Sequence, residues 1–578
     1  MFEKMQELLN LEKIQNYIPI YERFFNLTES NYNAINLNNT YRLDSLDEKI
    51  NYSKFMGTIA DICNNPMKKR IFFKFSPLID PIKYMMGKYD ISHNISDLPS
   101  KKETKETKET KETKQPKNKL ADPNNSAYTD GFFSYLSSIL LNKYGFLNGI
   151  DYYGSFLSVK RDFMVEISED LEYLDDYDSF HKNIDKIFKF VDNDKIRTRF
   201  RETKKNKKEI VIMNDEIDLE IQEIKEEIQD EIKEEIQHKI QDEIQEIQEF
   251  KEEDLNLNIV VEDLIKATEK VKLDIDDIDI ENTSQKTSSS CSSRCSNTES
   301  SKSNDEEEEQ EDEEEEEEDE DEDEEDEDEE ELFATINHFP VQAIALECCE
   351  DTLDSYIMNN KIKDPEWESI VLQILFTLIT YQKAFNFTHN DLHTNNIVYN
   401  YTEKKFLYYK FNNQHYKVPT LGKIYKIIDF GRAIYTFKKQ LICSDSYAED
   451  GDANSQYNCE PYLNTNKPRI DPNPSFDLCR LGCSLFDYFI DDIDDIRKLK
   501  SPIKKIIVSW VFDDNNKNML YKNDGDERYP DFKLYKMIAR IVHNHTPQKV
   551  LKNPVFDKYL IGKKKINNTG AIFSIDDL

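Results

Sequence analysis

The chain has 578 residues, and its 116 Asp and Glu against 76 Lys and Arg give a formal net charge of −40. This length allows more than one domain and a large buried core. Residues 305–331 contain 26 acidic side chains and Gln310, so the rest of the chain carries a net charge of −14. Such acidity argues against a nucleic-acid-binding surface, because phosphate contacts need Lys and Arg, and a basic protein is the natural partner for the acidic tract.

The cysteines and the apolar residues exclude two further classes of protein. Nine cysteines in a chain of this length are too few for a disulfide framework, and none has the spacing and partner histidines of a zinc site. Residues 1–10 lack the apolar region of a signal peptide, and no uninterrupted apolar run approaches the length that spans a membrane. We therefore expect a soluble, intracellular protein with reduced thiols and no membrane partner.

Helical periodicity marks the N-terminus. The apolar residues Phe2, Met5, Leu8 and Leu9 recur at the spacing of one helix face. We expect residues 1–50 to form a helical extension that packs against the following domain.

A lysine inside an apolar run is the first candidate for chemistry. The run reads R-I-F-F-K-F from Arg70 to Phe75, favours a strand, and ends at Ser76-Pro77. An unpaired ammonium group is costly to bury, so Lys74 needs a partner, and the phosphates of ATP would serve. The alternative is that Lys74 lies on an exposed strand face, as lysines on edge strands do.

A low-complexity linker and a helix follow this run. Residues 101–117 repeat K-E-T without an apolar face, so we expect 101–120 to be a disordered linker. Apolar residues at helical spacing predict a helix over 127–144, and residues 152–157 read as the next strand. The helix contains one acidic residue, Asp130.

Residues 206–331 change in composition, and we interpret them as a large insertion. Nine Ile residues between 217 and 247 recur every three or four positions among Glu, Gln and Lys, which predicts a helix with an apolar stripe. A coiled coil, a docked helix or a simple-sequence expansion with partial helicity would each produce this pattern. The Ser-rich stretch 284–303 and the acidic tract 305–331 are expected to be disordered, and we interpret the Ser-rich stretch as a linker rather than a phosphorylation target.

From Leu332 onward the composition is again that of a folded domain. Residues 341–346 form an apolar run suited to a buried strand, and E-C-C-E-D follows it. Apolar residues at helical spacing then predict a helix over 367–386, which leads into the most specific stretch of the chain.

That stretch runs from Thr388 to Ala433. It reads T-H-N-D-L-H-T-N-N-I at its start and K-I-I-D-F-G-R-A at its end. It places Asp391 and Asn396 five residues apart in a polar loop, and Asp429 after an apolar pair. Mg²⁺ prefers oxygen ligands and keeps substrate phosphates in its shell, so these three side chains suit Mg-ATP chemistry. The alternative is that all three only stabilise turns.

The order H-x-D-x-x-x-x-N followed by D-F-G resembles the catalytic and metal-binding loops of protein kinases. This resemblance implies a two-lobed α+β fold of the protein-kinase type, with a long acidic, low-complexity insertion in the N-terminal lobe. The implied division is an N-terminal helical extension (1–50), the first part of the N-terminal lobe (51–205), the insertion (206–331), strand five and the hinge (332–350), the C-terminal lobe (351–550) and a C-terminal tail (551–578).

The resemblance also implies a role for each candidate residue. Asp391 would accept the proton of the substrate hydroxyl, and Asn396 and Asp429 would hold Mg²⁺. Lys74 would be the strand-three lysine that holds the α- and β-phosphates of ATP. Asp130 stands on the helix whose acid pairs with that lysine in kinases, although a helix cap or an exposed position explains an Asp there equally well.

The apolar run before E-C-C resembles strand five and the hinge of kinases. Leu346 would be the gatekeeper, and the backbone of Glu347 to Cys349 would bind adenine. An ordinary connection between a strand and a helix is the alternative. Further along, S-F-D-L-C-R-L-G resembles the kinase helix whose Asp, here Asp477, receives backbone N–H groups of the catalytic loop. His389 is expected to pack under Phe430 as a structural residue.

Three departures from the kinase pattern stand out. Only Gly57 precedes Lys74 within its predicted sheet, so the glycine-rich phosphate loop is missing. Asn390 stands where kinases have the arginine that grips an activation-segment phosphate, and His393 stands where Ser/Thr kinases have lysine. Residues 432–474, which include Ser444, Ser446 and Tyr447, match the activation segment in position, but activation through a phosphate there is not expected.

We therefore expect an ATP- and Mg²⁺-dependent Ser/Thr kinase that acts on proteins, basic ones included. The H-N-D-L-H form is also similar to aminoglycoside and choline kinases, so a small-molecule phosphotransferase is one alternative. A catalytically weak pseudokinase scaffold is another, because the glycine-rich loop is missing. Large insertions in a chain rich in Asn, Ile and Lys resemble the Ser/Thr kinases of giant DNA viruses of the mimivirus type, which implies the host cytoplasm or the virion as the location.

Overall fold

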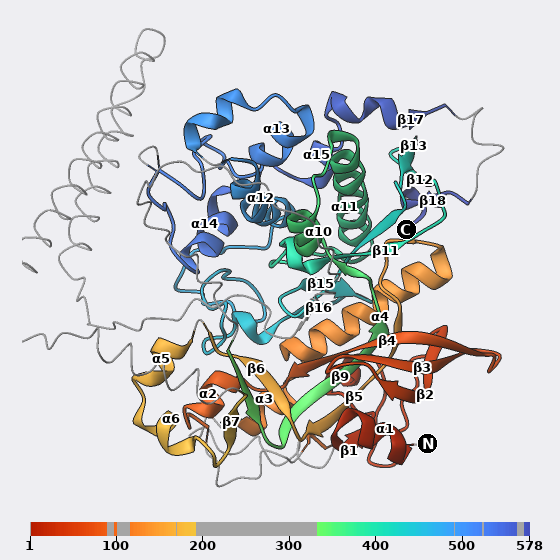
Figure 1. The fold of residues 1–578 in the computed structure, drawn as a ribbon, viewed down its shortest axis with the longest axis vertical. Coiled ribbons are helices and arrows are strands. Elements are labelled where there is room, and N and C mark those ends of the chain that lie inside the picture. The colour runs from red at the N-terminus through yellow and green to blue at the C-terminus, as the bar shows by residue number, and fades with distance from the viewer. Residues whose placement is uncertain are drawn as a thin grey trace, which may run out of the picture. The chain divides into compact units, whose positions relative to one another are not determined.

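The computed structural model describes residues 2–89, 98–100, 116–168, 170–191, 332–490, 492–522, 525–562 and 571–578. All of these residues belong to one compact unit of the chain. Helices and antiparallel strands are combined in it, as expected for an α+β protein (Figure 1). The predicted Ile-striped helix, the Ser-rich stretch and the acidic tract lie outside the described residues, as does the predicted linker up to residue 115.

The largest sheet has six strands, and every neighbouring pair in it is antiparallel. Phe73 and Phe75 flank Lys74 on a central strand of this sheet, so their side chains point to the opposite face from that of Lys74. That face of the sheet is therefore aromatic at its centre. Phe73 is fully buried against Phe55 of the next strand. The strands, in spatial order, are β1 (Leu11–Gln15), β5 (Tyr152–Lys160), β9 (Phe339–Glu347), β4 (Pro66–Pro77), β3 (Lys54–Asp61) and β2 (Tyr41–Lys49).

Helix α4 (Ser126–Tyr144) lies between this sheet and the helices of the C-terminal half (Figure 1). Asn125 caps its N-terminus by accepting a hydrogen bond from the Ala127 N–H, and Gly145, in the left-handed conformation, ends it. Phe133 of α4 packs on Tyr381 and Phe430 with ring centroids 5.1 and 4.6 Å away. This aromatic cluster joins α4 to the segment that contains the D-F-G motif.

A second, three-stranded sheet lies at the point where the insertion leaves and rejoins the described chain. Its order is β6 (Phe163–Glu166), β8 (Phe333–Ile336) and β7 (Phe188–Phe190), and both pairs are antiparallel. The Val191 N–H donates to the Phe333 carbonyl at 2.9 Å, so the chain ends flanking residues 192–331 are neighbours. Short helices accompany these strands: α2 (Pro81–Met85), α3 (Pro116–Ala121), α5 (Leu171–Asp175) and α6 (Asp178–Asn183).

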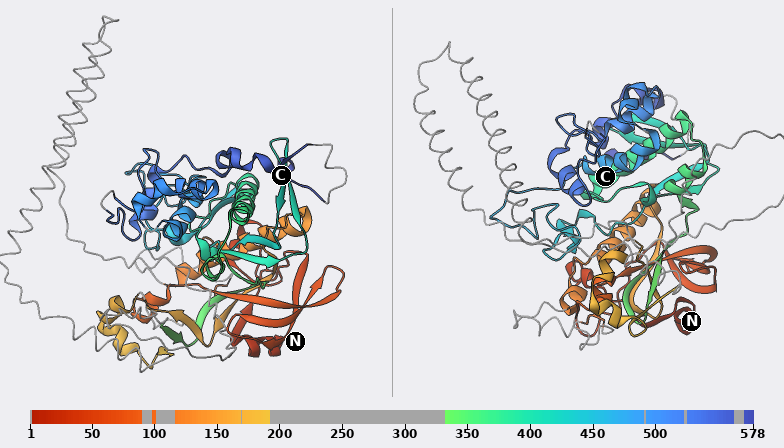
Figure 2. Two further views of the ribbon diagram at one scale, coloured as in Figure 1. Left: turned by 45° about the horizontal axis from the view of Figure 1, so that its top comes forward. Right: turned by 60° about the vertical axis from the view of Figure 1, so that its left-hand side comes forward.

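The C-terminal half is mainly helical. Its central helix, α11, is almost entirely buried, as its continuous apolar sequence requires. In both views of Figure 2, the blue C-terminal helices and the red N-terminal strands gather on separate sides. The helices are α10 (Leu353–Asn359), α11 (Asp364–Phe385), α12 (Phe476–Phe489), α13 (Pro502–Ser509), α14 (Lys533–Ile541) and α15 (Pro547–Val550).

Three small sheets complete this half. The first is β10-β11-β14 (Asp351–Thr352, Ile397–Tyr401, Lys423–Ile427), and the second is the hairpin β15-β16 (Ile434–Phe437, Gln440–Cys443). The third is β17-β13-β12-β18 (Leu560–Ile561, Gln414–Pro419, Phe406–Phe411, Phe573–Ser574).

Two terminal segments differ from the sequence prediction. The helix at the N-terminus, α1, spans only Phe2–Leu9, and residues 11–15 and 41–49 are strands of the large sheet, so a helical extension over 1–50 is wrong. Residues 551–562 and 571–578 contribute two strands to a sheet and bury Ile575 completely, so these residues are part of the domain rather than a tail.

The linker predicted for 101–120 is also too long, because its last residues form α3. Leu120 of that helix is buried, and its carbonyl accepts a hydrogen bond from the Tyr128 hydroxyl. Helix formation there follows from these contacts with α4, which the K-E-T repeat does not reveal. Among the described residues, no helix is both long and apolar enough to cross a membrane.

Candidate active site

Lys74 lies on β4 and faces α4. Its ammonium group forms ion pairs with Asp130 Oδ2 and Asp429 Oδ1, each at 2.7 Å, and only 12% of its side chain is exposed. Burial lowers the pKa of Lys74, but the two carboxylates outweigh this effect and shift the pKa above its ordinary value. Lys74 therefore does not lie on an exposed strand face.

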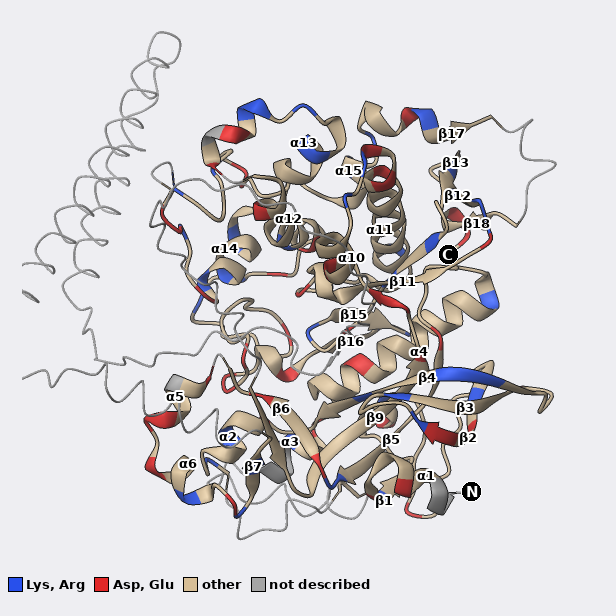
Figure 3. Ribbon diagram, viewed as in Figure 1, with Lys and Arg blue, Asp and Glu red and all other residues tan. Residues whose placement is uncertain are grey.

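Asp130 is the acidic partner of Lys74 on α4, where it is the one acidic position (Figure 3). It is buried, and its Oδ1 accepts a hydrogen bond from the Phe430 N–H at 2.9 Å. Burial raises its pKa, as does the charge of Asp429, while Lys74 opposes the shift. The cap of α4 is Asn125, so Asp130 is neither a cap nor an exposed residue.

A glycine explains how the short Asp130 side chain reaches Lys74. Gly131 has no side chain, and a Cβ atom there would lie 2.2 Å from Nε2 of Gln342, a buried residue of β9. Helix α4 can therefore approach the sheet more closely than a helix with any other residue at this position. The sequence prediction left a helix cap or an exposed position open for Asp130, because it did not consider this close approach.

Helix α12 anchors the loop that contains Asp391. The two carboxylate oxygens of Asp477 accept hydrogen bonds from the N–H groups of His389 and Asn390 at 3.0 and 2.9 Å. These bonds hold Asn390 at φ 68°, a left-handed conformation that Asn tolerates better than most residues. The structure thus places Asp477 in the anchoring contact expected from the sequence.

His389 packs beside Phe430, with ring centroids 5.7 Å apart. Its Nδ1 accepts a hydrogen bond from the Asp391 N–H at 3.3 Å, so its Nε2 is the donor to the Ile428 carbonyl at 2.9 Å. With both ring nitrogens bonded to the backbone, His389 has the structural role predicted for it.

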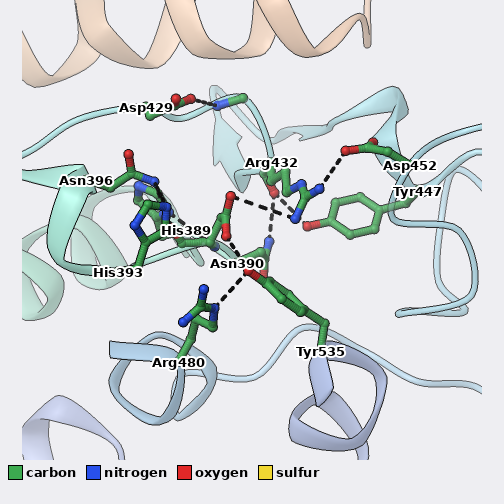
Figure 4. Close-up of polar contacts among 12 residues, drawn as sticks. His389, Asn390, His393, Asn396, Asp429, Arg432, Tyr447, Asp452, Arg480 and Tyr535 are labelled. Atoms are coloured by element: carbon green, nitrogen blue, oxygen red, sulfur yellow. Dashed lines mark hydrogen bonds and ion pairs between the residues drawn. The ribbon is translucent and has the colours of Figure 1, made fainter. Parts of the chain in front are cut away.

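Asp391 is buried, and both of its carboxylate oxygens face polar groups of other elements. Its Oδ1 accepts a hydrogen bond of 2.7 Å from the Tyr535 hydroxyl of α14, and its Oδ2 lies 3.7 Å from Nη1 of Arg432. The Tyr535 hydroxyl in turn accepts a hydrogen bond of 2.8 Å from Nε of Arg480 (Figure 4).

Pairing of β11 with β14 brings Asn396 next to the D-F-G segment. Ile397 pairs with Ile427, and the Ile428 N–H donates to the Asn396 carbonyl at 3.0 Å. The amide Nδ2 of Asn396 donates to the Asp391 carbonyl at 2.9 Å and lies 3.0 Å from Nε2 of His393. Burial lowers the pKa of His393, so its uncharged ring can accept this bond.

The amide oxygen of Asn396 points to the side on which Asp429 lies (Figure 4). Asp429 has φ 64°, and its Oδ1 contacts Lys74 and the Gly431 N–H. The two side chains offer oxygen ligands of the kind that Mg²⁺ prefers, and this ion takes its other ligands from water and phosphates. The described residues contain no cluster of three or more His, Cys, Asp or Glu suited to a metal, so Mg²⁺ would depend on such additional ligands.

The predicted hinge residues follow β9, and their side chains have different environments. Leu346 is buried with Ile344 and Tyr152. The Glu347 carboxylate forms an ion pair with Lys426 of β14 and accepts hydrogen bonds from the Asn400 amide at 2.8 Å and from the Asp151 N–H at 2.7 Å. Its carboxylate is therefore part of the structure that joins β9 to β14.

Cys349 comes two residues after Glu347. Burial raises the pKa of its thiol well above the ordinary value, so it is not a reactive thiolate. No described residue accepts a hydrogen bond from its backbone N–H. Among the described residues, this backbone N–H is therefore available as a hydrogen-bond donor.

The structure thus pairs Lys74 with Asp429 and bonds Asn396 to the backbone of Asp391. The backbone bond from Ile428, which precedes Asp429, to Asn396 brings the two pairs together. Sequence reasoning missed Arg432, Arg480 and Tyr535, which surround the Asp391 carboxylate. Of these, Arg432 and Arg480 had a local signal, because Arg432 directly follows D-F-G and Arg480 lies within S-F-D-L-C-R-L-G, whereas Tyr535 had none. No family model matches the chain, and no curated protein is similar enough to count as a relative.

Proposed function

We propose that the chain is an ATP- and Mg²⁺-dependent protein kinase that transfers the γ-phosphate of ATP to Ser or Thr hydroxyl groups of proteins. The observation that carries this proposal is the buried ion-pair set of Lys74 with Asp130 and Asp429. It joins a strand, a helix and the D-F-G segment around one cation. A cation beside a potential metal ligand suits the binding of a nucleotide phosphate chain.

In this proposal each residue has a distinct task. Asp391 orients the acceptor hydroxyl and accepts its proton, while Lys74 balances the charge of the α- and β-phosphates. Asn396 and Asp429 would hold Mg²⁺, which when bound neutralises charge on the phosphates. Catalysis then depends on positioning and on charge stabilisation.

The same proposal assigns the two halves of the described chain to the two lobes of a kinase. The six-stranded sheet with α4 would be the N-terminal lobe, and residues 351–550 the C-terminal lobe. The backbone N–H of Cys349 would donate to the adenine ring beside Leu346. The bonds from Asp477 to the loop, together with the ordered segment 432–474, favour a protein kinase over a small-molecule phosphotransferase.

The decisive experiment is Mg²⁺-dependent transfer of labelled γ-phosphate by the purified full chain. Acceptors are a basic protein, casein and small aminoalcohols, assayed side by side. The variant Asp391→Asn should lower kcat by on the order of 10²–10⁴, because a positioned general base contributes about that much. The matched control is Asp531→Asn, an exposed Asp at φ 55° that Asn can also adopt.

Label on Ser or Thr of a protein, lost in Asp391→Asn and kept in Asp531→Asn, is the expected result. Label on the aminoalcohols alone would replace the proposal with a small-molecule phosphotransferase. Absence of transfer to every acceptor by folded protein would show that the chain is a scaffold.

A further inference from the structure

Arg432 occupies a position beside the catalytic loop that the sequence motif does not require. Its Nη1 lies 3.7 Å from Asp391 Oδ2, and its Nη2 donates to Asp452 Oδ2 at 2.7 Å. The guanidinium lies 5.6 Å from the centroid of the Tyr535 ring and 5.9 Å from that of Phe532. With 9% of its surface exposed, Arg432 is held in this orientation by its surroundings.

The backbone of Arg432 is fixed as well. Its carbonyl accepts hydrogen bonds from the Asn390 amide at 2.9 Å and from the Tyr447 hydroxyl at 2.7 Å (Figure 4). The oxygen of the Asn390 amide accepts a further bond from Tyr457 at 2.7 Å. Asn390 stands where the resemblance leads one to expect an arginine, and here its side chain holds the backbone of another arginine.

The hydroxyl groups of segment 432–474 that were considered for phosphorylation are enclosed. Ser444, Ser446 and Tyr447 are all buried, and the Tyr447 hydroxyl is committed to the Arg432 carbonyl. The ion pair with Arg432 is made instead by a carboxylate, that of Asp452.

Asp452 is charged under ordinary conditions. Its side chain is 53% exposed, and the charge of Arg432 together with its hydrogen bond lowers the pKa of the Asp452 carboxylate to about 2. Asp452 thus offers a permanent negative charge to Arg432, at a place where a phosphate would supply one only after modification.

We propose that Arg432 is a positioning residue for Asp391 and that Asp452 takes the place of an activating phosphate. Arg432 connects the carboxylate of the catalytic loop to segment 432–474 through one guanidinium. Assembly of the site then needs no phosphorylation of that segment. This inference rests on the proposed kinase activity.

The first test is Asp452→Asn, which removes the charge and keeps the shape. We expect kcat to fall at least about fivefold, a coupling of ordinary size between two sites. KM for ATP should stay unchanged, because Lys74 and Asp429 are not in contact with Asp452. Asp452→Glu should restore part of the activity, whereas loss of a merely structural contact would lower the melting temperature, lower kcat and raise KM together. The matched control is Glu449→Gln, an exposed acid of the same segment, which should behave as wild type.

The second test is a double-mutant cycle with Arg432→Gln. If the two residues act through one ion pair, Arg432→Gln combined with Asp452→Asn should be no slower than Arg432→Gln alone. Independent, additive losses would show that Asp452 does not act through Arg432.

The third test needs no variant. Wild-type protein treated with a phosphatase, and shown by mass spectrometry to carry no phosphate on 432–474, should keep its full kcat. Loss of activity after this treatment, or wild-type kinetics in Asp452→Asn, would overturn the inference while leaving the kinase activity established. Absence of transfer by the wild-type chain itself would overturn the proposed function and this inference with it.

Discussion

Tyr535 connects two charged side chains at the centre of the site. Its hydroxyl donates to Asp391 and accepts from Arg480, so the direction of the phenolic proton is fixed by both neighbours. The Asp391 carboxylate cannot rotate freely while this bond and the nearby Arg432 hold its two oxygens. At this scale, the orientation of one carboxylate depends on three residues outside the catalytic loop.

Replacing Tyr535 by Phe tests this dependence. The ring keeps its packing, but Asp391 and Arg480 lose the hydroxyl between them, so we expect kcat to fall by about tenfold and KM for ATP to stay constant. Steady-state kinetics with ATP and a protein acceptor measure both constants. Tyr529→Phe, a change on a ring outside this chain of hydrogen bonds, is the control, and equal kinetics in both variants would contradict the assignment.

The residues of the site that sequence could predict share one property, which is a local pattern. Asp391, Asn396 and Asp429 lie within motifs, and Lys74 is set apart by an apolar run. Tyr535 has no such pattern, because an amphipathic helix shows which face is buried but not which loop that face meets. Tyr535 reaches Asp391 only through the packing of α14 against the loop that contains Asp391.

At the scale of elements, an acidic residue links segment 432–474 to α4. The Asp445 carboxylate accepts a hydrogen bond of 2.8 Å from the Ser126 N–H in the first turn of α4 and lies 3.5 Å from Lys119 of α3. An anion at a helix N-terminus is favourable, because the N–H groups there lack partners within the helix. Burial nevertheless raises the pKa of Asp445 to about 6.

This raised pKa has a consequence for stability that Asp445→Asn can measure. Because the folded protein holds the proton more tightly than the unfolded chain, Asp445 lowers the free energy of unfolding as pH rises from about 4 to about 6. The loss amounts to about 3 kcal/mol for a shift of about two pKa units. Asn can still accept the Ser126 bond but does not titrate, so it should lack this part of the pH dependence.

Denaturant unfolding of both proteins at pH 4 and pH 7 provides the comparison. The free energy of unfolding of Asp445→Asn minus that of wild type should be larger at pH 7 than at pH 4. An identical difference at the two pH values would show that Asp445 does not titrate in this window.

Most helices and strands near the site could be predicted from the sequence, whereas strands at the edge of the large sheet could not. Apolar runs and helical periodicity located β4, α4, β5, β9 and α11 to within a few residues. Strand β2 lies at the sheet edge with one buried residue, so its alternation is too weak to be separated from a helical pattern. Pairing with β3, which depends on distant residues, decides its structure.

At the scale of the whole molecule, residues 192–331 interrupt the described chain in sequence, yet the residues on either side of them are neighbours in space. Val191, which directly follows β7, donates a backbone hydrogen bond to Phe333 of β8. A hairpin loop of about two to five residues would bridge such strands. The described fold therefore does not need residues 192–331 in order to connect its two parts.

Replacing residues 192–331 by a short Gly-Ser loop should leave the folded domain intact. We expect a single cooperative unfolding transition, with a midpoint no lower than that of the full chain, and Mg²⁺-dependent transfer at an unchanged kcat. Circular dichroism melting and the labelled-phosphate assay provide the measurements. A protein that no longer unfolds cooperatively would show that the insertion stabilises the domain.

The two ion pairs of Lys74 make its electrostatic environment depend on two separate parts of the chain. One ammonium group meets a carboxylate from α4 and another from the D-F-G segment, so the three groups carry a net charge of −1 while all of them are ionised. A ligand that drew α4 away from the sheet would remove one of these carboxylates and leave Asp429 as the remaining counter-ion of Lys74. A compound bound beside α4 would in this way change the charge around Lys74 without contacting either Lys74 or Asp429.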